Sequence, residues 1–370
     1  MDLSNRVSDR LGSRPIIIPV ADLTAEPFDN EADANRDVSS TLQNGATGAW
    51  ERVVPAPASR GAGKPIRTFL RKLSRPFLVF ERYPIARRRV VSVSARIIRF
   101  HAARMLNRSF VFTLLPPVRL RVRFDFGSPV VAYYIGLYEK SSMTFLLRYL
   151  RQDEGFVDVG ANVGVYTVLA AGVAGARVRA FEPFSGAYDA LVENVSLNAL
   201  DDRVELHRRG IGSRNAKAFI TTAHKGGNRI TGAKTGETLE RIDIVSLDHA
   251  VGTDVPDAIK IDVEGYEEQV LRGARRILSS RKNNVVIIEA IDRDPGCGHV
   301  DRCVSILTRF GFRLCTYDPD TNRLTECGRG ARAFVGPNDE NYLFVKDIEK
   351  ARRRIGQAGR GMGNVREERP

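Results

Sequence analysis

The stretch Phe156-Val157-Asp158-Val159-Gly160-Ala161-Asn162-Val163-Gly164-Val165-Tyr166-Thr167 decides the fold of this chain. It begins as an apolar run typical of a buried strand, passes through a glycine turn that carries an acid and an amide, and ends as the start of a helix. Gly160 and Gly164 allow the backbone to turn sharply and to approach a ligand, while free amides at the helix start face whatever binds there. The stretch therefore predicts a ligand-binding turn.

The spacing of this turn, D-x-G-x-N-x-G, differs from two commoner glycine loops. A dinucleotide-binding G-x-G-x-x-G needs a third glycine where this chain has Val163 or Val165, and a phosphate-binding P-loop needs a lysine that is absent. Asp158 would repel a pyrophosphate but would suit a ligand that carries an ammonium or a sulfonium. This chemistry favours S-adenosylmethionine, although a glycine turn after an apolar strand is also an ordinary connection.

The composition is that of a soluble globular protein. The 370 residues are 43% hydrophobic and 27% charged, which allows one large domain with extra segments, or two domains. No apolar run could span a membrane and the beginning lacks a secretory signal, so we expect a cytoplasmic protein. We also expect reduced thiols and no metal site, because the cysteines lack the spacing of a zinc finger or ribbon. They are Cys297, Cys303, Cys315 and Cys327.

Positive charge is concentrated in one region. The net charge is +13, and residues 60–123 hold 17 Lys and Arg against one acid, Glu81. The region mixes arginine with apolar residues, which predicts helices with a basic face. These helices could be solvated or could cover the main domain, or they could contact an anionic membrane surface or a lipid-linked substrate from the periphery. Nucleic acid is not expected as a partner, because no binding motif is present.

The chain divides into four segments by composition. We expect a disordered tail at residues 1–60, a basic helical arm at 61–110, the main domain at 111–348 and a disordered basic tail at 349–370. At the start of the main domain, strands are expected at 120–126 and 130–134, followed by a helix that ends near residue 150.

From residue 156 onward, strand and helix patterns alternate. The expected strands are 156–159, 177–181, 204–208, 259–262, 285–289, 313–317 and 342–345, and the expected helices are 165–171, 187–198, 267–279 and 300–310. This alternation predicts an α/β fold with a mostly parallel, Rossmann-like, seven-stranded sheet whose ligand lies at the carboxyl ends of the strands. A Gly-, Thr- and Lys-rich insertion at 218–245 interrupts it and is a candidate substrate flap.

Charged residues stand at the ends of two of these strands. Glu182 follows the second strand about twenty residues after the turn, where a carboxylate can accept both hydroxyls of a ribose. Lys260, Asp262 and Glu264 alternate along the fourth strand, so they point to one side near its carboxyl end. Charges so close to a buried strand are costly unless they are paired or used, which favours a functional role.

The ordered motifs together resemble the FkbM family of S-adenosylmethionine-dependent methyltransferases. They lie within residues 130–346 and are Gly136-Leu137-Tyr138-Glu139, Asp158-Val159-Gly160-Ala161-Asn162-Val163-Gly164, Phe181-Glu182-Pro183, Glu193-Asn194-Val195-Ser196-Leu197-Asn198, Lys260-Ile261-Asp262-Val263-Glu264-Gly265-Tyr266-Glu267, Val270-Leu271-Arg272-Gly273-Ala274 and Asn341-Tyr342-Leu343-Phe344. The resemblance implies a class I methyltransferase sheet and S-adenosyl-L-methionine as cofactor. It does not cover the first hundred or so residues.

The resemblance also implies roles for particular residues. The cofactor-binding residues would be Asp158, Gly160, Asn162, Gly164, Glu182 and Asn198. The acceptor would be a hydroxyl of a glycan, a glycolipid or another secondary metabolite. Because an alcohol is a poor nucleophile, a base that removes its proton assists attack on the methyl group. Asp262 is the first candidate for the base or its orienting group, with Lys260 and Glu264 setting its charge. His249 is a second candidate base.

Three other functions compete with an O-methyltransferase. A non-catalytic, cofactor-binding scaffold of the same fold is the main alternative, and turnover of a labelled methyl donor separates the two. A nucleic-acid methyltransferase lacks its Asn/Asp-Pro-Pro-Tyr signature, because Asp262-Val263-Glu264-Gly265 stands in that place. A nicotinamide oxidoreductase lacks G-x-G-x-x-G.

Overall fold

The computed structural model describes residues 17–18, 78–222, 230–231, 239–292, 297–328, 333–334 and 341–361. The tail expected at 1–60 lies outside the described residues, except for β1 (Ile17–Ile18), which pairs with β15 (Ala333–Phe334). Residues 61–77 of the expected arm also lie outside them, as do 362–370 at the carboxyl end.

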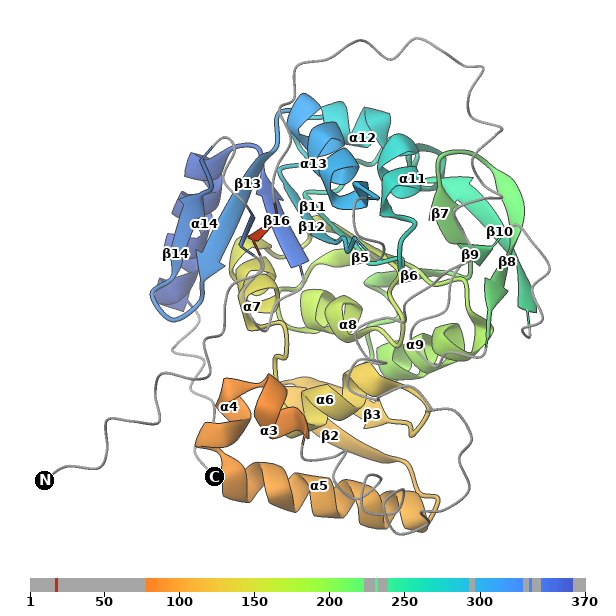
Figure 1. Ribbon diagram of the computed structural model, residues 1–370, viewed down its shortest axis with the longest axis vertical. Coiled ribbons are helices and arrows are strands. Elements are labelled where there is room, and N and C mark those ends of the chain that lie inside the picture. The colour runs from red at the N-terminus through yellow and green to blue at the C-terminus, as the bar shows by residue number, and fades with distance from the viewer. Residues whose placement is uncertain are drawn as a thin grey trace, which may run out of the picture.

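The centre of the protein is an eight-stranded sheet in the order β14-β13-β16-β12-β11-β4-β5-β6 (Figure 1). Its strands are β4 (Gly155–Val159), β5 (Arg177–Phe181), β6 (Val204–His207), β11 (Ala258–Ile261), β12 (Val285–Glu289), β13 (Arg313–Asp318), β14 (Arg323–Glu326) and β16 (Asn341–Val345). The run from β12 to β6 is parallel, and β16 is antiparallel to both of its neighbours. This is the expected class I methyltransferase arrangement. All seven predicted strands are present, and β14 adds an eighth at the edge.

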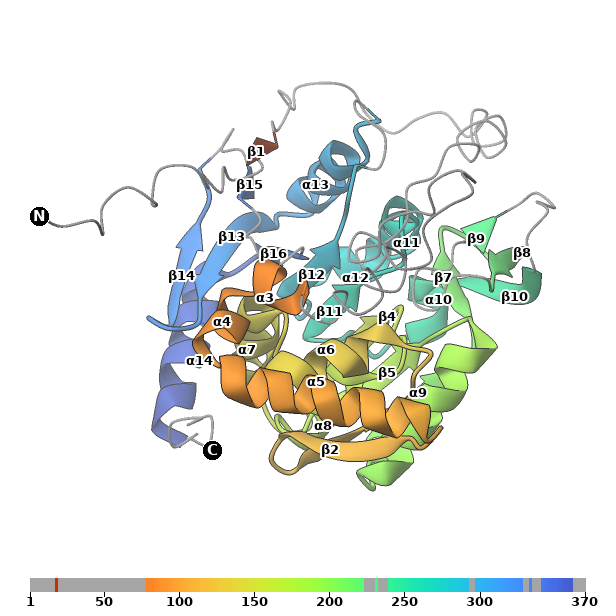
Figure 2. The same cartoon turned by 60° about the horizontal axis from the view of Figure 1, so that its bottom comes forward.

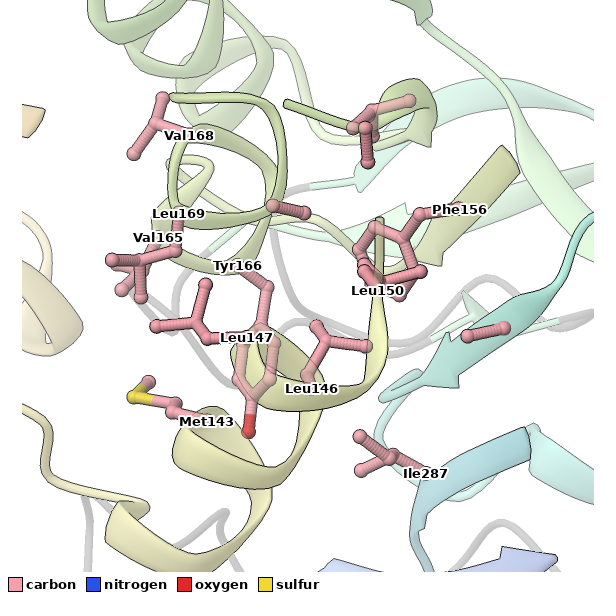
Figure 3. Packing of buried hydrophobic residues seen from close by; sticks show 14 of the residues in the cluster. Met143, Leu146, Leu147, Leu150, Phe156, Val165, Tyr166, Val168, Leu169 and Ile287 are labelled. Atoms are coloured by element: carbon pink, nitrogen blue, oxygen red, sulfur yellow. The ribbon is translucent and has the colours of Figure 1, made fainter. Parts of the chain in front are cut away.

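Helices cover both faces of the sheet. One face carries α7 (Lys140–Tyr149), α8 (Val165–Gly172), α9 (Ser185–Leu197) and α14 (Ile348–Gly361). The other carries α10 (Leu247–Val251), α11 (Glu267–Arg272), α12 (Arg275–Ser279) and α13 (His299–Arg309). Strand residues alternate between the two layers, so that Phe156 packs in the first and Val157 in the second. Figure 3 shows Phe156 with side chains of α7 and α8 in the first layer.

The sequence predicts one helix at 267–279, but the structure has two, α11 and α12. The break falls at Gly273, where an added Cβ would lie 2.0 Å from the carbonyl oxygen of Gly212. The backbone of the helix junction therefore packs directly against β7 (Gly210–Gly212). Helical periodicity does not report such a contact.

The prediction of a strand at 130–134 was wrong. These residues belong to α6 (Gly127–Ile135), in which every residue from Ser128 to Ile135 except Val130 is buried. Pro129 lies in the first turn of this helix, where backbone amides have no helical partner and proline is tolerated. An apolar run of this length does not by itself distinguish a buried helix from a buried strand.

A compact module precedes the sheet and lies below it in Figure 1. We call residues 78–135 the N-terminal module; it consists of α3 (Leu78–Arg82), α4 (Pro84–Arg88), α5 (Val90–Met105), β2 (Phe110–Leu115), β3 (Val118–Val122) and α6. The expected basic helices are present as α3 to α5. They share a core with β3 and α6 through Val93, Ile97, Val122 and Tyr134, so the boundary expected at residue 110 divides a single packed unit.

Residues 349–361 are helical, so the prediction of a disordered tail at 349–370 was wrong for this part. Ile348, Ala351 and Ile355 form the buried side of α14 against α7, at the spacing of one helix face. Arg354 donates two hydrogen bonds of 2.7 Å to the carboxylate of Glu154. The segment was predicted to be disordered from its arginine-rich composition, which does not show that its apolar residues recur at helical spacing.

The insertion at 218–245 contains strands rather than only a loop. A second sheet has the order β7-β10-β8-β9, with β8 (Ala216–Thr221), β9 (Ile230–Thr231) and β10 (Leu239–Ser246). Residues 223–229 and 232–238 of the candidate flap lie outside the described residues. In the part of the chain that is described, no helix is both long and apolar enough to cross a membrane.

Candidate active site

The glycine turn between β4 and α8 has a strained backbone that only particular residues adopt. Gly160, Asn162 and Gly164 have φ angles of 80°, 52° and 89°. The amides of Gly160 and Ala161 donate to the carbonyl oxygen of Phe181 at the end of β5. A Cβ on Gly160 would lie 1.7 Å from the carbonyl oxygen of Asp262. The turn is therefore held between β5 and the residue that follows β11, with no room for a side chain at Gly160.

Asp158 is the second-to-last residue of β4, and its side chain is buried. Its Oδ2 accepts a 2.6 Å hydrogen bond from Thr167 Oγ1, while its buried Oδ1 has no hydrogen-bond partner among the described residues. Burial raises the pKa of this carboxyl, and the nearby Lys260 ammonium opposes the rise. Buried hydrogen-bond acceptors without a partner are uncommon in folded proteins. The Oδ1 atom of Asp158 is therefore suited to accept a hydrogen bond from a bound ligand.

Glu182 follows β5 and holds the same turn. Its Oε2 accepts a 2.9 Å hydrogen bond from the amide of Asn162, and its Oε1 accepts one of 2.9 Å from the amide of Phe184. Burial raises the pKa of Glu182 to about 7, although these two amides lower it. Each carboxylate oxygen can still accept one more hydrogen bond. The side-chain Oδ1 of Asn162 is buried without a partner in the described part of the structure.

Lys260 and Asp262 form an ion pair beside the turn. Lys260 Nζ lies 2.7 Å from Asp262 Oδ2 and 4.8 Å from the centre of the Tyr166 ring. Lys260 is also the register neighbour of Asp158 on the adjacent parallel strand. Burial lowers the pKa of Lys260, but the carboxylates of Asp262, Glu139 and Asp158 raise it by more, so the ammonium is retained. The expected alternation along β11 thus brings both side chains to one side.

The loop after β11 has a fixed shape. Glu264 and Gly265 have φ angles of 57° and 101°. The carboxylate of Glu267 accepts hydrogen bonds from the amides of Val263 and Gly265 at 3.3 and 2.8 Å. Its other oxygen lies 2.6 Å from His299 Nε2. This buried pair supports the loop that carries Asp262 and Glu264.

The structure adds residues to the site that the sequence did not assign to it. Glu139 Oε2 accepts hydrogen bonds from the Tyr166 hydroxyl at 2.6 Å and from Asn341 Nδ2 at 2.5 Å. Glu289, at the end of β12, is the register partner of Asn341. Glu139 and Asn341 stand in two of the family-like motifs, and Glu289 stands at a predicted strand end.

The acids in this region lie close enough to Glu289 to raise its pKa. Burial raises the pKa of Glu289 well above its ordinary value, and the charges of Asp262, Glu139 and Glu264 raise it further, against the opposing effect of Lys260. Burial also raises the pKa of Tyr138, followed by the effects of Glu139, Asp262, the Tyr83 side chain and Glu289. We call Glu139, Asp262, Glu264 and Glu289 the acidic wall. Tyr83, from the N-terminal module, lies near it.

Two predicted residues are not part of this site. Asn198 lies at the far end of α9, where its Oδ1 accepts from the Arg119 amide and its Nδ2 donates to the carbonyl oxygens of Arg119 and Asn194. Among the described residues, Asn198 makes no side-chain hydrogen bond to the turn; the contact from α9 to the turn is made by Asn194, whose Nδ2 donates to the carbonyl oxygen of Val163 at 2.9 Å. His249 is exposed on α10, which precedes the amino end of β11, and it does not reach the acidic wall.

Among the described residues, no group of three or more His, Cys, Asp and Glu side chains could hold a metal ion. All four cysteines are free thiols, and Cys303 and Cys315 are buried.

The carboxyl ends of β4 and β11 meet where the order of strands along the chain reverses, which is the usual ligand site of such sheets. The family described as Methyltransferase FkbM domain matches residues 158–314. We call this matched segment the FkbM domain. The FkbM domain contains the turn, Glu182 and the Lys260–Asp262 pair. Glu139, Tyr138 and Asn341 lie outside it and complete the site from both sides of the matched segment.

One relative of this chain is also a methyltransferase by name. The hexuronic acid methyltransferase AglP of Haloferax volcanii is 30% identical over 156 residues, which make up 41% of this chain and 62% of AglP. The chain therefore matches less than two thirds of the length of that relative.

Solved structures are more distant. An rRNA methylase from Streptococcus thermophilus is 17% identical, with 55% of this chain and 93% of that chain covered at a TM-score of 0.33. A candidate methyltransferase from Streptococcus mutans, in complex with SAH, is 15% identical, with 55% and 95% covered at a TM-score of 0.35. TM-scores below 0.5 are too low to support a fold assignment. The fold of the FkbM domain is therefore assigned from its strand order.

Proposed function

We propose that this protein transfers a methyl group from S-adenosylmethionine to a hydroxyl of a glycan, a glycolipid or another secondary metabolite. The observation that carries the proposal is the position of the acidic wall beside the glycine turn, at the reversal point of an FkbM-type sheet. The glycine turn has features suited to a nucleoside with a cationic group. The acidic wall has carboxylates that can accept hydrogen bonds from the hydroxyls of an acceptor.

The turn is suited to the methyl donor. When bound, S-adenosylmethionine supplies a methyl group on a positively charged sulfur. Two buried oxygens without partners, Asp158 Oδ1 and Asn162 Oδ1, are available to accept hydrogen bonds from its polar groups. Glu182 has the capacity to accept two ribose hydroxyls while it holds the turn. Gly160 lets the turn pack directly against the carbonyl oxygen of Asp262, which keeps the turn next to the acidic wall.

Asp262 is the residue we propose to accept the proton of the acceptor hydroxyl, or to orient that hydroxyl. Its side chain is 26% exposed, whereas that of its partner Lys260 is 4% exposed, so Asp262 can meet a substrate while Lys260 supports it from below. Lys260 keeps a positive charge next to Asp262 and holds its side chain in place through their 2.7 Å ion pair. Holding the acceptor oxygen in line with the methyl group contributes to the rate together with proton removal.

The acidic wall favours a hydroxyl over a carboxylate as acceptor. AglP is named for a hexuronic acid, which suggests a sugar as acceptor here as well. Any carboxylate of the acidic wall would repel an acceptor carboxylate, whereas carboxyl oxygens of all four side chains can accept hydrogen bonds from sugar hydroxyls. We therefore propose ether formation at a hydroxyl, with Glu264 and Glu289 helping to hold the sugar.

The first experiment is titration calorimetry of the full-length protein with S-adenosylhomocysteine. Asp158→Asn and Glu182→Gln should abolish binding, whereas Asp254→Asn, an exposed carboxylate near the amino ends of the strands, should not. Thermal melting identifies any variant that fails to fold. Folded wild-type protein that does not bind would reject the proposal.

Turnover of a labelled methyl donor with a panel of sugars and glycolipids then distinguishes an enzyme from the alternative. Transfer to a hydroxyl supports the proposed activity. Donor binding that leads to no transfer with any acceptor would favour a non-catalytic, cofactor-binding scaffold.

A further inference from the structure

The helix α5 has two apolar sides. One side, with Val93, Ile97 and Phe100, is buried in the core of the N-terminal module. The other side is exposed: Val91 is 85%, Ile98 70% and Met105 87% accessible. These three positions are seven residues apart, which is close to two helical turns, so they lie in one line along the helix.

Exposed alanines fill the gaps in this line. Ala95 and Ala102 lie between the three larger side chains and are exposed as well. We call Val91, Ala95, Ile98, Ala102 and Met105 the α5 stripe. Its fourteen-residue span corresponds to about 20 Å. It runs along nearly the whole helix, on the side opposite to the buried face.

The exposed apolar surface of the described residues is concentrated here. Six large hydrophobic side chains are exposed in the described part of the chain, and all except Val192 lie on α5 or directly after it. Figures 1 and 2 show α5 along the outer edge of the N-terminal module, with α6 on its inner side. A contiguous apolar line of this kind, rather than scattered single residues, marks an interaction surface.

The surroundings of the stripe are positively charged. No Asp or Glu stands between Glu81 and Asp125 in the sequence. The exposed arginines on or next to α5 are Arg87, Arg88, Arg96, Arg99, Arg104 and Arg108. A partner must therefore accept apolar side chains and carry negative charge at the same time.

We infer that the α5 stripe docks on an anionic lipid bilayer surface. The helix would lie in the plane of the interface, with Val91, Ile98 and Met105 inserted at the boundary between headgroups and acyl chains. The flanking arginines would contact lipid phosphates. A second copy of this chain fits less well, because pairing two α5 helices would bring two sets of arginines together without an acid to neutralise them.

The test is co-sedimentation of the full-length protein with vesicles. Two compositions are used, phosphatidylcholine alone and phosphatidylcholine mixed with phosphatidylglycerol. Binding is expected to the mixed vesicles only and should weaken as salt is raised. Ile98→Asp should lower the partition coefficient by at least about tenfold, because it replaces a large apolar side chain with a charge. Val192→Asp, the matched change on α9, should leave it near the wild-type value.

Two charge-reversal variants test the electrostatic contribution to vesicle binding. Arg99→Glu should weaken sedimentation with the mixed vesicles, whereas Arg281→Glu, an exposed arginine of the FkbM domain, should have much less effect. Equal sedimentation of Ile98→Asp and wild type would overturn the inference, as would no binding to anionic vesicles. Light scattering that shows a dimer lost in Ile98→Asp would also overturn it, by assigning the stripe to a second copy.

Discussion

Lys260 Nζ lies 2.7 Å from Asp262 Oδ2, two residues further along the same chain. The pair spans the end of β11, with Lys260 inside the sheet and Asp262 at its rim. Burial raises the pKa of Asp158, and the same ammonium, which belongs to its register neighbour on β11, opposes that rise. One buried cation thus connects the proposed donor side of the site with the proposed acceptor side.

Replacing Lys260 with methionine should reduce methyl transfer by at least about 100-fold. The pKa values of Asp158 and Glu289 are already raised by burial, and Lys260 opposes that rise at both. Without the ammonium these pKa values should rise further, so the remaining activity should need a higher pH. The measurement is the pH profile of the rate. Lys282→Met, a half-exposed lysine that pairs with Asp254, is the matched control and should keep the wild-type profile.

Asp262→Asn should lower the rate of transfer by about 10²- to 10⁴-fold, the usual contribution of a positioned base. Affinity for S-adenosylhomocysteine should remain close to that of the wild type, since the turn and Glu182 are unchanged. Rate measurements at saturating donor and calorimetry separate the two effects. Unchanged turnover in this variant would remove Asp262 from the mechanism.

Binding of the donor product should strengthen as the pH rises through about 7, the pKa of Glu182. Only the ionised carboxylate accepts hydrogen bonds at both oxygens from ribose hydroxyls as well as from the two amides. The effect on stability has the opposite sign. Because the folded pKa is raised, the contribution of Glu182 to the free energy of unfolding is complete below its unfolded pKa and is lost as the pH rises through about 7.

Calorimetry and thermal melting across this pH range check both trends. Glu182→Gln, which should not bind the donor product, should lose the pH dependence of melting, and it should also lose stability because an amide cannot accept at both of its ends. A wild-type affinity that is flat between about pH 6 and pH 8 contradicts the assigned role.

Gly160→Ala should be destabilising by at least about 2 kcal/mol. The residue has a φ of 80°, and its new Cβ would lie 1.7 Å from the carbonyl oxygen of Asp262. Gly252→Ala is a suitable control, because its φ of 60° carries similar strain but no atom lies within 4 Å of the added Cβ. Urea unfolding of the two variants measures the part of the cost that comes from the close approach of turn and loop. Equal losses in both variants would show that only backbone strain matters.

Asn198→Ala should lower stability by about 1–3 kcal/mol while donor affinity is unchanged. The side chain makes three hydrogen bonds, two to Arg119 of β3 and one to the carbonyl oxygen of Asn194 within α9. Thermal melting and calorimetry on the same preparation give both quantities. A selective loss of donor binding would restore Asn198 to the cofactor site.

Short-range patterns were sufficient for the central sheet. The strands that hold Asp158, Glu182 and Lys260 are apolar runs bounded by glycine and polar residues, and each was predicted within about two residues. The pattern was ambiguous where apolar residues are buried on all sides, as in α6, and where arginines dominate the composition, as in α14. In those segments burial depends on neighbours that are distant in sequence.

Local patterns were enough to predict the seven strands of the main domain, the glycine turn and the acids at strand ends, because these depend on backbone preferences and on alternation along one strand. Which acids meet depends on the tertiary structure. Glu139 and Asn341 are 202 residues apart, and Asn198 belongs to a family-like motif but faces β3. Packing also decided that α5 has an exposed apolar stripe, because which face of an amphipathic helix is buried depends on the surfaces that the rest of the chain presents to it.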